Sequence, residues 1–114
     1  MSDLLNKKCV PCEGGVLPFD ISEIHKYQKK VDGWEIAKDD KEIFFLHKEF
    51  KFKNVIESQN FINEVGALSE KEGHHPDISF GWGYAKIKIT THAIEGLSEN
   101  DFILAAKIDK IINA

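Results

Sequence analysis

Three helix-capping patterns, spread along 114 residues, constrain the fold of this chain more than any other feature. In each pattern a polar N-cap residue stands three positions before an acidic residue, which satisfies the free amide groups at a helix start. The pairs are Asp20 with Glu23, Asn54 with Glu57 and Ser98 with Asp101. They predict three helices, each beginning directly after its cap, with two intervals of non-helical chain between them.

Apolar residues recur at helical spacing after each cap, so each helix has one side suited to burial. The first helix extends towards Val31 and stops at Asp32-Gly33. The second covers roughly five turns and ends at Gly73, because glycine readily adopts the left-handed conformation that closes a helix. The third follows Gly96 and occupies the C-terminal segment.

The two intervals between the helices are each typical of a pair of strands. The first pair is Trp34 to Lys38 and Glu42 to Phe50, and the second is Asp77 to Trp82 and Tyr84 to Thr91. The last strand alternates apolar and polar residues, which predicts one buried and one open face. His92 continues the polar phase, so we expect it on the open side at the strand's end.

The order of helix, two strands, helix, two strands and helix predicts an α+β fold built as a two-layer sandwich. Short connections favour antiparallel pairing, so we expect a four-stranded antiparallel sheet with the helices on one face. The edge strands and the open sheet face need protection, and self-association would provide it economically.

Length and composition indicate a single domain over residues 1–114, with no internal repeat or linker. The net charge of −4 argues against nucleic acid as the ligand, because neutralising phosphates supplies most of that binding energy. No apolar run approaches the roughly 18 residues that a membrane span requires. The N-terminus lacks the apolar core of a signal peptide, which predicts a cytoplasmic protein without membrane contact.

Residues 1–19 are predicted to form an extended leader that contains both cysteines, Cys9 and Cys12. One such pair supplies only half of a four-ligand zinc site, and the chain has no second pair. A thioredoxin-like role would need the pair between a strand and a helix. We therefore interpret the leader as inert or structural with reduced thiols, and a redox or metal role is the alternative.

Three of the five histidines, His74, His75 and His92, lie close together, the first two between Gly73 and Pro76. Gly73 is expected to end the preceding helix, and Pro76 to hold His75 in an extended conformation. The adjacent imidazoles therefore leave a helix-to-strand corner in different directions. Because the unperturbed histidine pKa of roughly 6.5 lies near neutral pH, this cluster indicates proton transfer or metal ligation.

Each candidate residue also has a simpler interpretation. Histidines at a helix end complement the macrodipole, and a histidine on a strand surface needs no role. Asp101 is the acid of its capping box, while Glu70 lies one turn before His74 and either orients that imidazole or is a surface charge. Trp34 and Trp82 fit packing as well as stacking on a planar heterocycle. Taken jointly, the histidines favour a functional site.

Zinc ligation is the main alternative chemistry, since three histidines can hold zinc and leave an open position. Adjacent histidines diverge, however, and are poorly suited to joint ligation. The helical pattern of two ligands four residues apart is absent as well. We therefore predict a site that uses no metal.

The spacing of these residues resembles the signature of the pterin-4a-carbinolamine dehydratase family. Three residues separate Glu70 from His74-His75-Pro76, five separate Pro76 from Trp82, nine separate Trp82 from His92, and eight separate His92 from Asp101. The leader of microbial members has a cysteine pair like the one in Cys9-Val10-Pro11-Cys12. The family's tryptophan at the first strand is matched by Gly33-Trp34, and its entry to the last helix by Gly96-Leu97-Ser98. The resemblance extends over nearly the whole chain.

The resemblance implies the dehydration of 4a-hydroxytetrahydrobiopterin to quinonoid dihydropterin, which recycles the cofactor of aromatic amino-acid hydroxylases. It implies a homodimer or homotetramer and no metal or organic cofactor. His74 and His92 would act as acid and base, and His75 would hold and orient the pterin. The other substrate-binding positions that the resemblance implies are Glu70, Pro76, Trp34 and Asp101.

Two other functions remain open. Animal relatives also act as dimerisation cofactors of a homeodomain transcription factor, which would make this chain a protein-binding module. The pterin could instead serve another pathway, such as molybdopterin metabolism. The enzyme is favoured over the binding module because the leader resembles microbial members and the sequence offers no evident transcription-factor partner.

Overall fold

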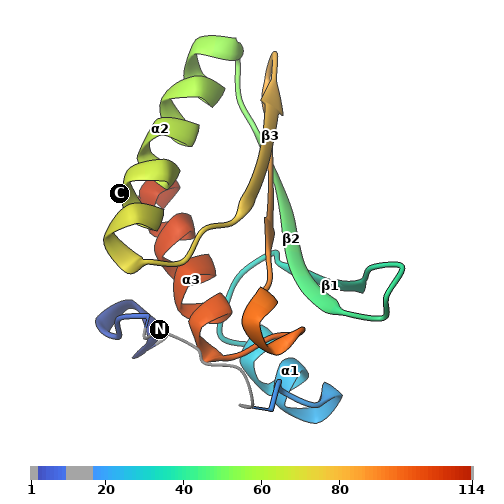
Figure 1. The fold of residues 1–114 in the computed structure, drawn as a ribbon. Coiled ribbons are helices and arrows are strands. Elements are labelled where there is room, and N and C mark those ends of the chain that lie inside the picture. The colour runs from blue at the N-terminus through green and yellow to red at the C-terminus, as the bar shows by residue number, and fades with distance from the viewer. Residues whose placement is uncertain (1–2, 10–16, 114) are drawn as a thin grey trace.

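The computed structural model describes residues 3–9 and 17–113 (Figure 1). Its helical elements are η1 (Asp3–Asn6), α1 (Ile21–Gln28), α2 (Val55–Glu72), η2 (His92–Ile94) and α3 (Glu99–Asn113), where η marks a short 3-10 helix. Its strands are β1 (Glu35–Lys38), β2 (Phe44–Lys51), β3 (Asp77–Gly81) and β4 (Tyr84–Ile89). The predicted order of elements is confirmed.

The four strands form one antiparallel sheet in the order β1-β2-β4-β3. The central strands β2 and β4 belong to different hairpins, so their pairing joins the two halves of the chain. The three α-helices lie on one side of this sheet, with α2 and α3 packed against each other (Figure 1). The predicted two-layer α+β fold is therefore confirmed.

The core lies between the sheet and α3. On β4 the alternating Ala85, Ile87 and Ile89 are buried against the helices, and Lys86 between them is exposed. Most side chains of α3 from Phe102 to Ile108 are buried, because α1, α2 and η1 contact this helix on its other sides. A helix that is apolar nearly all round needs such cover.

The predicted end of β4 is two residues too late. The strand ends at Ile89, and Thr91 instead pairs with Gly96 through a 2.9 Å hydrogen bond from its amide to the Gly96 carbonyl. This bridge closes a tight loop that contains η2, and Glu95 adopts a left-handed φ of 54° to complete it. His92 consequently begins a helical turn and does not continue the strand.

Prediction and structure differ most in the leader, which was predicted to be extended. Residues 3–6 form η1, and Leu4 is fully buried beside α3. Cys9 is also buried, whereas its predicted companion Cys12 lies outside the described residues. Among the described helices, none is both long enough and apolar enough to cross a membrane.

Candidate active site

The corner between α2 and β3 carries the two adjacent histidines. Asn54 caps the start of α2 as predicted, accepting a hydrogen bond from the Glu57 amide at 2.9 Å. At its other end Gly73 has a φ of 68°, and the amides of Gly73 and His74 both donate to the Ser69 carbonyl. Glycine accepts this left-handed conformation without steric cost. The corner therefore forms for the reason that the sequence indicated.

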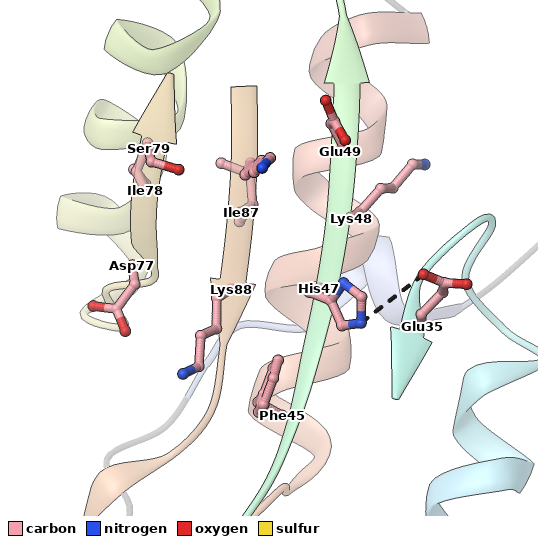
Figure 2. Close-up of a pocket in the computed structure, with 11 residues that line it drawn as sticks. Glu35, Phe45, His47, Lys48, Glu49, Asp77, Ile78, Ser79, Ile87 and Lys88 are labelled. Carbon is pink, nitrogen blue, oxygen red and sulfur yellow. Dashed lines mark ion pairs between the residues drawn. The ribbon is translucent and has the colours of Figure 1, made fainter. Parts of the chain in front are cut away.

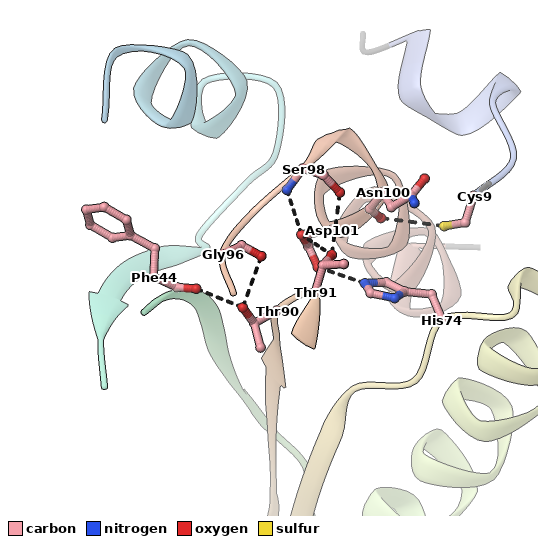
Figure 3. Close-up of polar contacts among 9 residues, drawn as sticks. All are labelled: Cys9, Phe44, His74, Thr90, Thr91, Gly96, Ser98, Asn100 and Asp101. Atoms are coloured by element: carbon pink, nitrogen blue, oxygen red, sulfur yellow. Dashed lines mark hydrogen bonds and ion pairs between the residues drawn. The ribbon is translucent and has the colours of Figure 1, made fainter. Parts of the chain in front are cut away.

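His74 points inward from this corner and meets the first turn of α3. Its Nε2 lies 2.7 Å from Oδ1 of Asp101, whose side chain is completely buried (Figure 3). A buried carboxylate is tolerated only where hydrogen bonds or an opposite charge replace its lost water. Asp101 thus holds the His74 imidazole in one orientation.

Asp101 also holds the chain segment that leads into His92. Its Oδ2 accepts one hydrogen bond from the Thr91 hydroxyl and another from the Ser98 amide, each at 2.8 Å (Figure 3). The contact with Ser98 is the acid's half of the predicted capping box. One buried carboxylate therefore connects His74 to the residue that directly precedes His92.

Thr90 holds the loop of residues 91–96, which carries His92, against the sheet. Its hydroxyl lies 2.8 Å from the Phe44 carbonyl on β2 and 3.3 Å from the Gly96 carbonyl (Figure 3). The two adjacent threonines thereby anchor the start of the loop that carries His92 to the sheet and to α3, and Thr90 also contacts the other end of the loop at Gly96.

His75 leaves the corner in the opposite direction and is exposed. It pairs through Nε2 with the carboxylate of Glu70. Of the two interpretations of Glu70, the structure shows an exposed charge that pairs with His75 and not with His74, because the chain turns at the left-handed Gly73. Two adjacent histidines acquire separate carboxylate partners.

His92 opens onto a hollow on the face of the sheet that the helices leave uncovered. This hollow has a volume of about 190 Å³ and includes Lys88 and Phe45 in its lining. Those two residues also line a larger hollow of about 560 Å³, which Figure 2 shows bordered by Asp77 at the start of β3. The two hollows therefore share Phe45 and Lys88, and their linings together reach from the His92 loop to the strand that follows the histidine corner.

The two tryptophans lie in contrasting environments. Trp34 is 3% exposed, its indole donates to Oδ2 of Asp109 at 3.0 Å, and its ring meets Phe50 edge-on. These contacts fit the packing interpretation, and a role for Trp34 beside substrate stays a prediction. Trp82 is 74% exposed at the turn between β3 and β4. Pro76 is half-buried at the corner itself.

Thr91 is a site residue that the sequence analysis missed. It occupies the next position in the apolar phase of Ala85, Ile87 and Ile89, so a polar side chain there is expected to be buried. Buried hydroxyl groups are almost always hydrogen-bonded, and this signal pointed to a polar partner across the core. No cluster of three or more His, Cys, Asp or Glu side chains suited to a metal ion occurs within residues 3–9 and 17–113.

Comparisons with known proteins show which family the chain resembles. The family model described as pterin 4 alpha carbinolamine dehydratase matches residues 18–111. A Rubrobacter xylanophilus protein, provisionally named as a pterin-4-alpha-carbinolamine dehydratase, is 45% identical over 111 residues. The alignment covers 97% of this chain and all of that protein. A similarly named Halorhodospira halophila protein is 47% identical over 108 residues, which cover 95% of this chain and 96% of the relative.

Two solved structures share the fold. A transcriptional coactivator/pterin dehydratase from Brucella melitensis superposes with a TM-score of 0.74 at 26% identity, covering 82% of this chain and 97% of the other. A pterin dehydratase-like protein described as a RuBisCO assembly factor in the alpha-carboxysome superposes with a TM-score of 0.61 at 26% identity. That alignment covers 72% of this chain and 92% of the other.

Proposed function

This chain belongs to the pterin 4 alpha carbinolamine dehydratase family, and from that premise we propose that it dehydrates 4a-hydroxytetrahydrobiopterin to quinonoid dihydropterin. One observation supports this assignment above the others. The buried Asp101 carboxylate joins His74 to Thr91 and so holds two histidine-bearing segments in a fixed relation, with His92 itself beside a hollow on the sheet face.

The reaction needs only proton transfers. The C4a–O bond breaks and the hydroxyl group leaves as water after it gains a proton from an acid. A base removes the proton of the adjacent ring nitrogen, whose electron pair then forms the new double bond to C4a. No electron is exchanged with another molecule, and each correctly placed acid or base contributes roughly 10²–10⁴-fold.

His74 and His92 supply the acid and the base in this proposal. With Nε2 of His74 donating to Asp101, its Nδ1 is the ring atom presented to substrate. His92 acts from the loop that Thr90 and Thr91 anchor beside the hollow. The acid gives up one proton and the base takes up one, so proton exchange with water restores both after each turnover.

His75 and Glu70 bind the pterin. Both are exposed, so their mutual contact can open and let Glu70 accept hydrogen bonds from ring N–H groups. Pro76 and Trp34 would border the bound ring. The product serves tetrahydrobiopterin recycling for an aromatic amino-acid hydroxylase in the cytoplasm, and the protein works as a homodimer or homotetramer.

The test is the rate of dehydration of freshly generated 4a-hydroxytetrahydrobiopterin, followed by ultraviolet absorbance with EDTA present. His75→Ala and His92→Ala should lose at least 100-fold in turnover and keep the wild-type melting temperature. His25→Ala is the matched control, because His25 is an exposed histidine on α1, where it contacts Gln28. Turnover like that of wild type in both site variants would contradict the assigned roles.

A protein-binding role is the second candidate, and the exposed turn between β3 and β4 favours it. Trp82 and Phe80 are large apolar side chains in contact with water there, and patches of this kind often mark partner surfaces. The coactivator and assembly-factor descriptions of the two structural neighbours point the same way. Capture of a stoichiometric partner by a variant without the three site histidines, with no turnover by wild type, would favour this function.

A further inference from the structure

The segment of residues 3–9, here called the leader clamp, crosses the two helix ends that carry the buried histidine–carboxylate pair. Its contacts are divided between the last turn of α2 and the first turn of α3. They are Lys7 Nζ to Glu99 Oε2 at 2.7 Å, Lys8 Nζ to the Lys71 carbonyl at 2.9 Å, the Cys9 amide to Glu72 Oε1 at 2.9 Å, and Cys9 Sγ to the Asn100 carbonyl at 3.5 Å. Asn100 directly precedes Asp101.

Glu72 is the central residue of this arrangement. Its Oε1 accepts the Cys9 amide, and its Oε2 lies 2.7 Å from the Lys107 ammonium group on α3. Both members of the ion pair are shielded from water, since the Glu72 and Lys107 side chains are 3% and 17% exposed. One carboxylate therefore ties the end of α2 to both the leader clamp and α3.

The position of Glu72 is electrostatically unfavourable without these partners. A negative charge in the last turn of a helix opposes the macrodipole, and a buried carboxylate loses its hydration. Burial alone would raise the pKa of Glu72, but the hydrogen bonds from Lys107 and the Cys9 amide hold it below its ordinary value of 4.5. The charge at this position is thus compensated by specific contacts.

Cys9 is kept as a neutral thiol at the same place. Burial and the neighbouring Glu72 charge raise the pKa of Cys9 to about 12, so its Sγ–H remains a donor to the Asn100 carbonyl at any physiological pH. A thiol held in this way is a structural group with low reactivity. The leader clamp therefore contacts α3 through Cys9 and α2 through Glu72.

We propose that Glu72 is a positioning residue of the active site, which fixes the end of α2 against α3 so that His74 keeps its hydrogen bond to Asp101. Glu72 stands two residues before His74, and the 2.7 Å contact between His74 and Asp101 spans the same two helices. A shift of about 1 Å at such a contact can cost as much as 100-fold in rate. The inference rests on the proposed dehydratase function.

The test combines kinetics with a signal of the His74 ring. In Glu72→Gln the side-chain oxygen can still accept from the Cys9 backbone amide, but the negative charge that faces the Lys107 ammonium group is removed. We expect kcat to fall roughly 10-fold with KM within twofold, because positioning acts on the transition state. In imidazole ¹H–¹⁵N spectra, the downfield proton shared by His74 and Asp101 should broaden or shift, while the His25 signals stay unchanged.

Asp109→Asn is the matched control. Asp109 lies on α3, as Lys107 does, and forms a largely buried ion pair with Lys48 of β2. In this variant the Asn side chain can still accept from the Trp34 indole. This variant should lose stability and keep both kcat and the His74 signal. Glu72→Gln with wild-type kcat and an unchanged His74 signal would overturn the proposal.

Two further outcomes are also decisive. If Glu72→Gln does not fold, Lys107→Gln is measured in its place, because it weakens the same ion pair from the side of α3. If neither variant folds, the ion pair serves stability and the positioning role is overturned. If wild type shows no turnover, the dehydratase proposal fails by itself. The His74 signal then still decides whether Glu72 positions that ring.

Discussion

The adjacent histidines His74 and His75 each pair with a carboxylate, yet the two pairs lie in opposite environments. The side chains of His74 and Asp101 are 14% and 0% exposed, whereas those of His75 and Glu70 are 59% and 78% exposed. The buried pair joins α2 and α3 across 27 positions of sequence, and the exposed pair spans only five. A histidine and a carboxylate therefore make one rigid contact and one that water can open.

The difference follows from solvation. An exposed ion pair gains little because water screens the attraction, and holding two side chains together costs conformational entropy. A buried carboxylate whose partner is removed leaves a charge or donor that water cannot reach. The pair of His74 and Asp101 is consequently suited to fix the orientation of an imidazole ring, and the pair of His75 and Glu70 to exchange its contact for another partner.

Removing the Asp101 carboxylate should have the largest effect. Asp101→Ala deprives His74, the Thr91 hydroxyl and the Ser98 amide of their acceptor at once. We expect the free energy of unfolding to fall by about 3–5 kcal/mol and turnover to be lost. Urea denaturation measures the first effect. A loss below about 1 kcal/mol would remove the distinction between the two pairs, since that is the range of exposed pairs.

A subtler change tests the link between the buried pair and His92. Thr91→Val keeps the shape of the side chain and removes the hydroxyl that donates to Asp101. Removing one of the two hydrogen bonds that Oδ2 of this buried carboxylate accepts should cost about 1–3 kcal/mol. Turnover should fall more than in Thr91→Ser, which retains the hydroxyl and serves as the control. Equal turnover in the two variants would show that the hydrogen bond between Thr91 and Asp101 does not affect catalysis.

Acid titration tests the buried charges near the corner. Because the pKa of Glu72 lies below its unfolded value of 4.5, its charge contributes stability that is fully present above pH 4.5. That contribution is lost as the pH falls from 4.5 through the folded pKa. Denaturation midpoints between pH 6 and pH 3 should therefore decline less steeply in Glu72→Gln. Parallel curves for the variant and wild type would contradict the contacts assigned to Glu72.

The smallest structural effect is expected at the exposed pair. Glu70→Gln should change the free energy of unfolding by less than about 1 kcal/mol, because the pair is largely hydrated. The same change should raise KM and leave kcat nearly unaltered if Glu70 acts in binding. Kinetics at low and at molar salt measure both constants, and Lys51→Gln, at another exposed pair, is the control. A collapse of kcat would assign Glu70 to the chemical step.

Features set by local chemistry were predictable. The cap at Asn54 and the left-handed end at Gly73 gave both boundaries of α2, because each depends on residues within one helical turn. The alternation in β4 identified its buried face in the same way. The end of β4 was misplaced because the pairing of Thr91 with Gly96 depends on a bridge across a loop.

The partners of the site residues were not predictable from spacing. Helical periodicity suggested Glu70 beside His74, but the turn at Gly73 rotates the chain, so that His75 meets Glu70 and His74 meets Asp101. Nothing local in the leader indicated that Leu4 would be buried against α3 or that Cys9 would contact Glu72. Such contacts appear only when segments distant in sequence are packed together.

The sequence by itself determined the order of helices and strands and the corner that bears two histidines, because caps, glycine and proline act through steric and hydrogen-bonding effects over a few residues. It also supplied the spacing that identifies the family. Only the tertiary structure decided which carboxylate is buried and which imidazole it orients. That choice depends on desolvation, which is a property of the packed chain and not of any single segment.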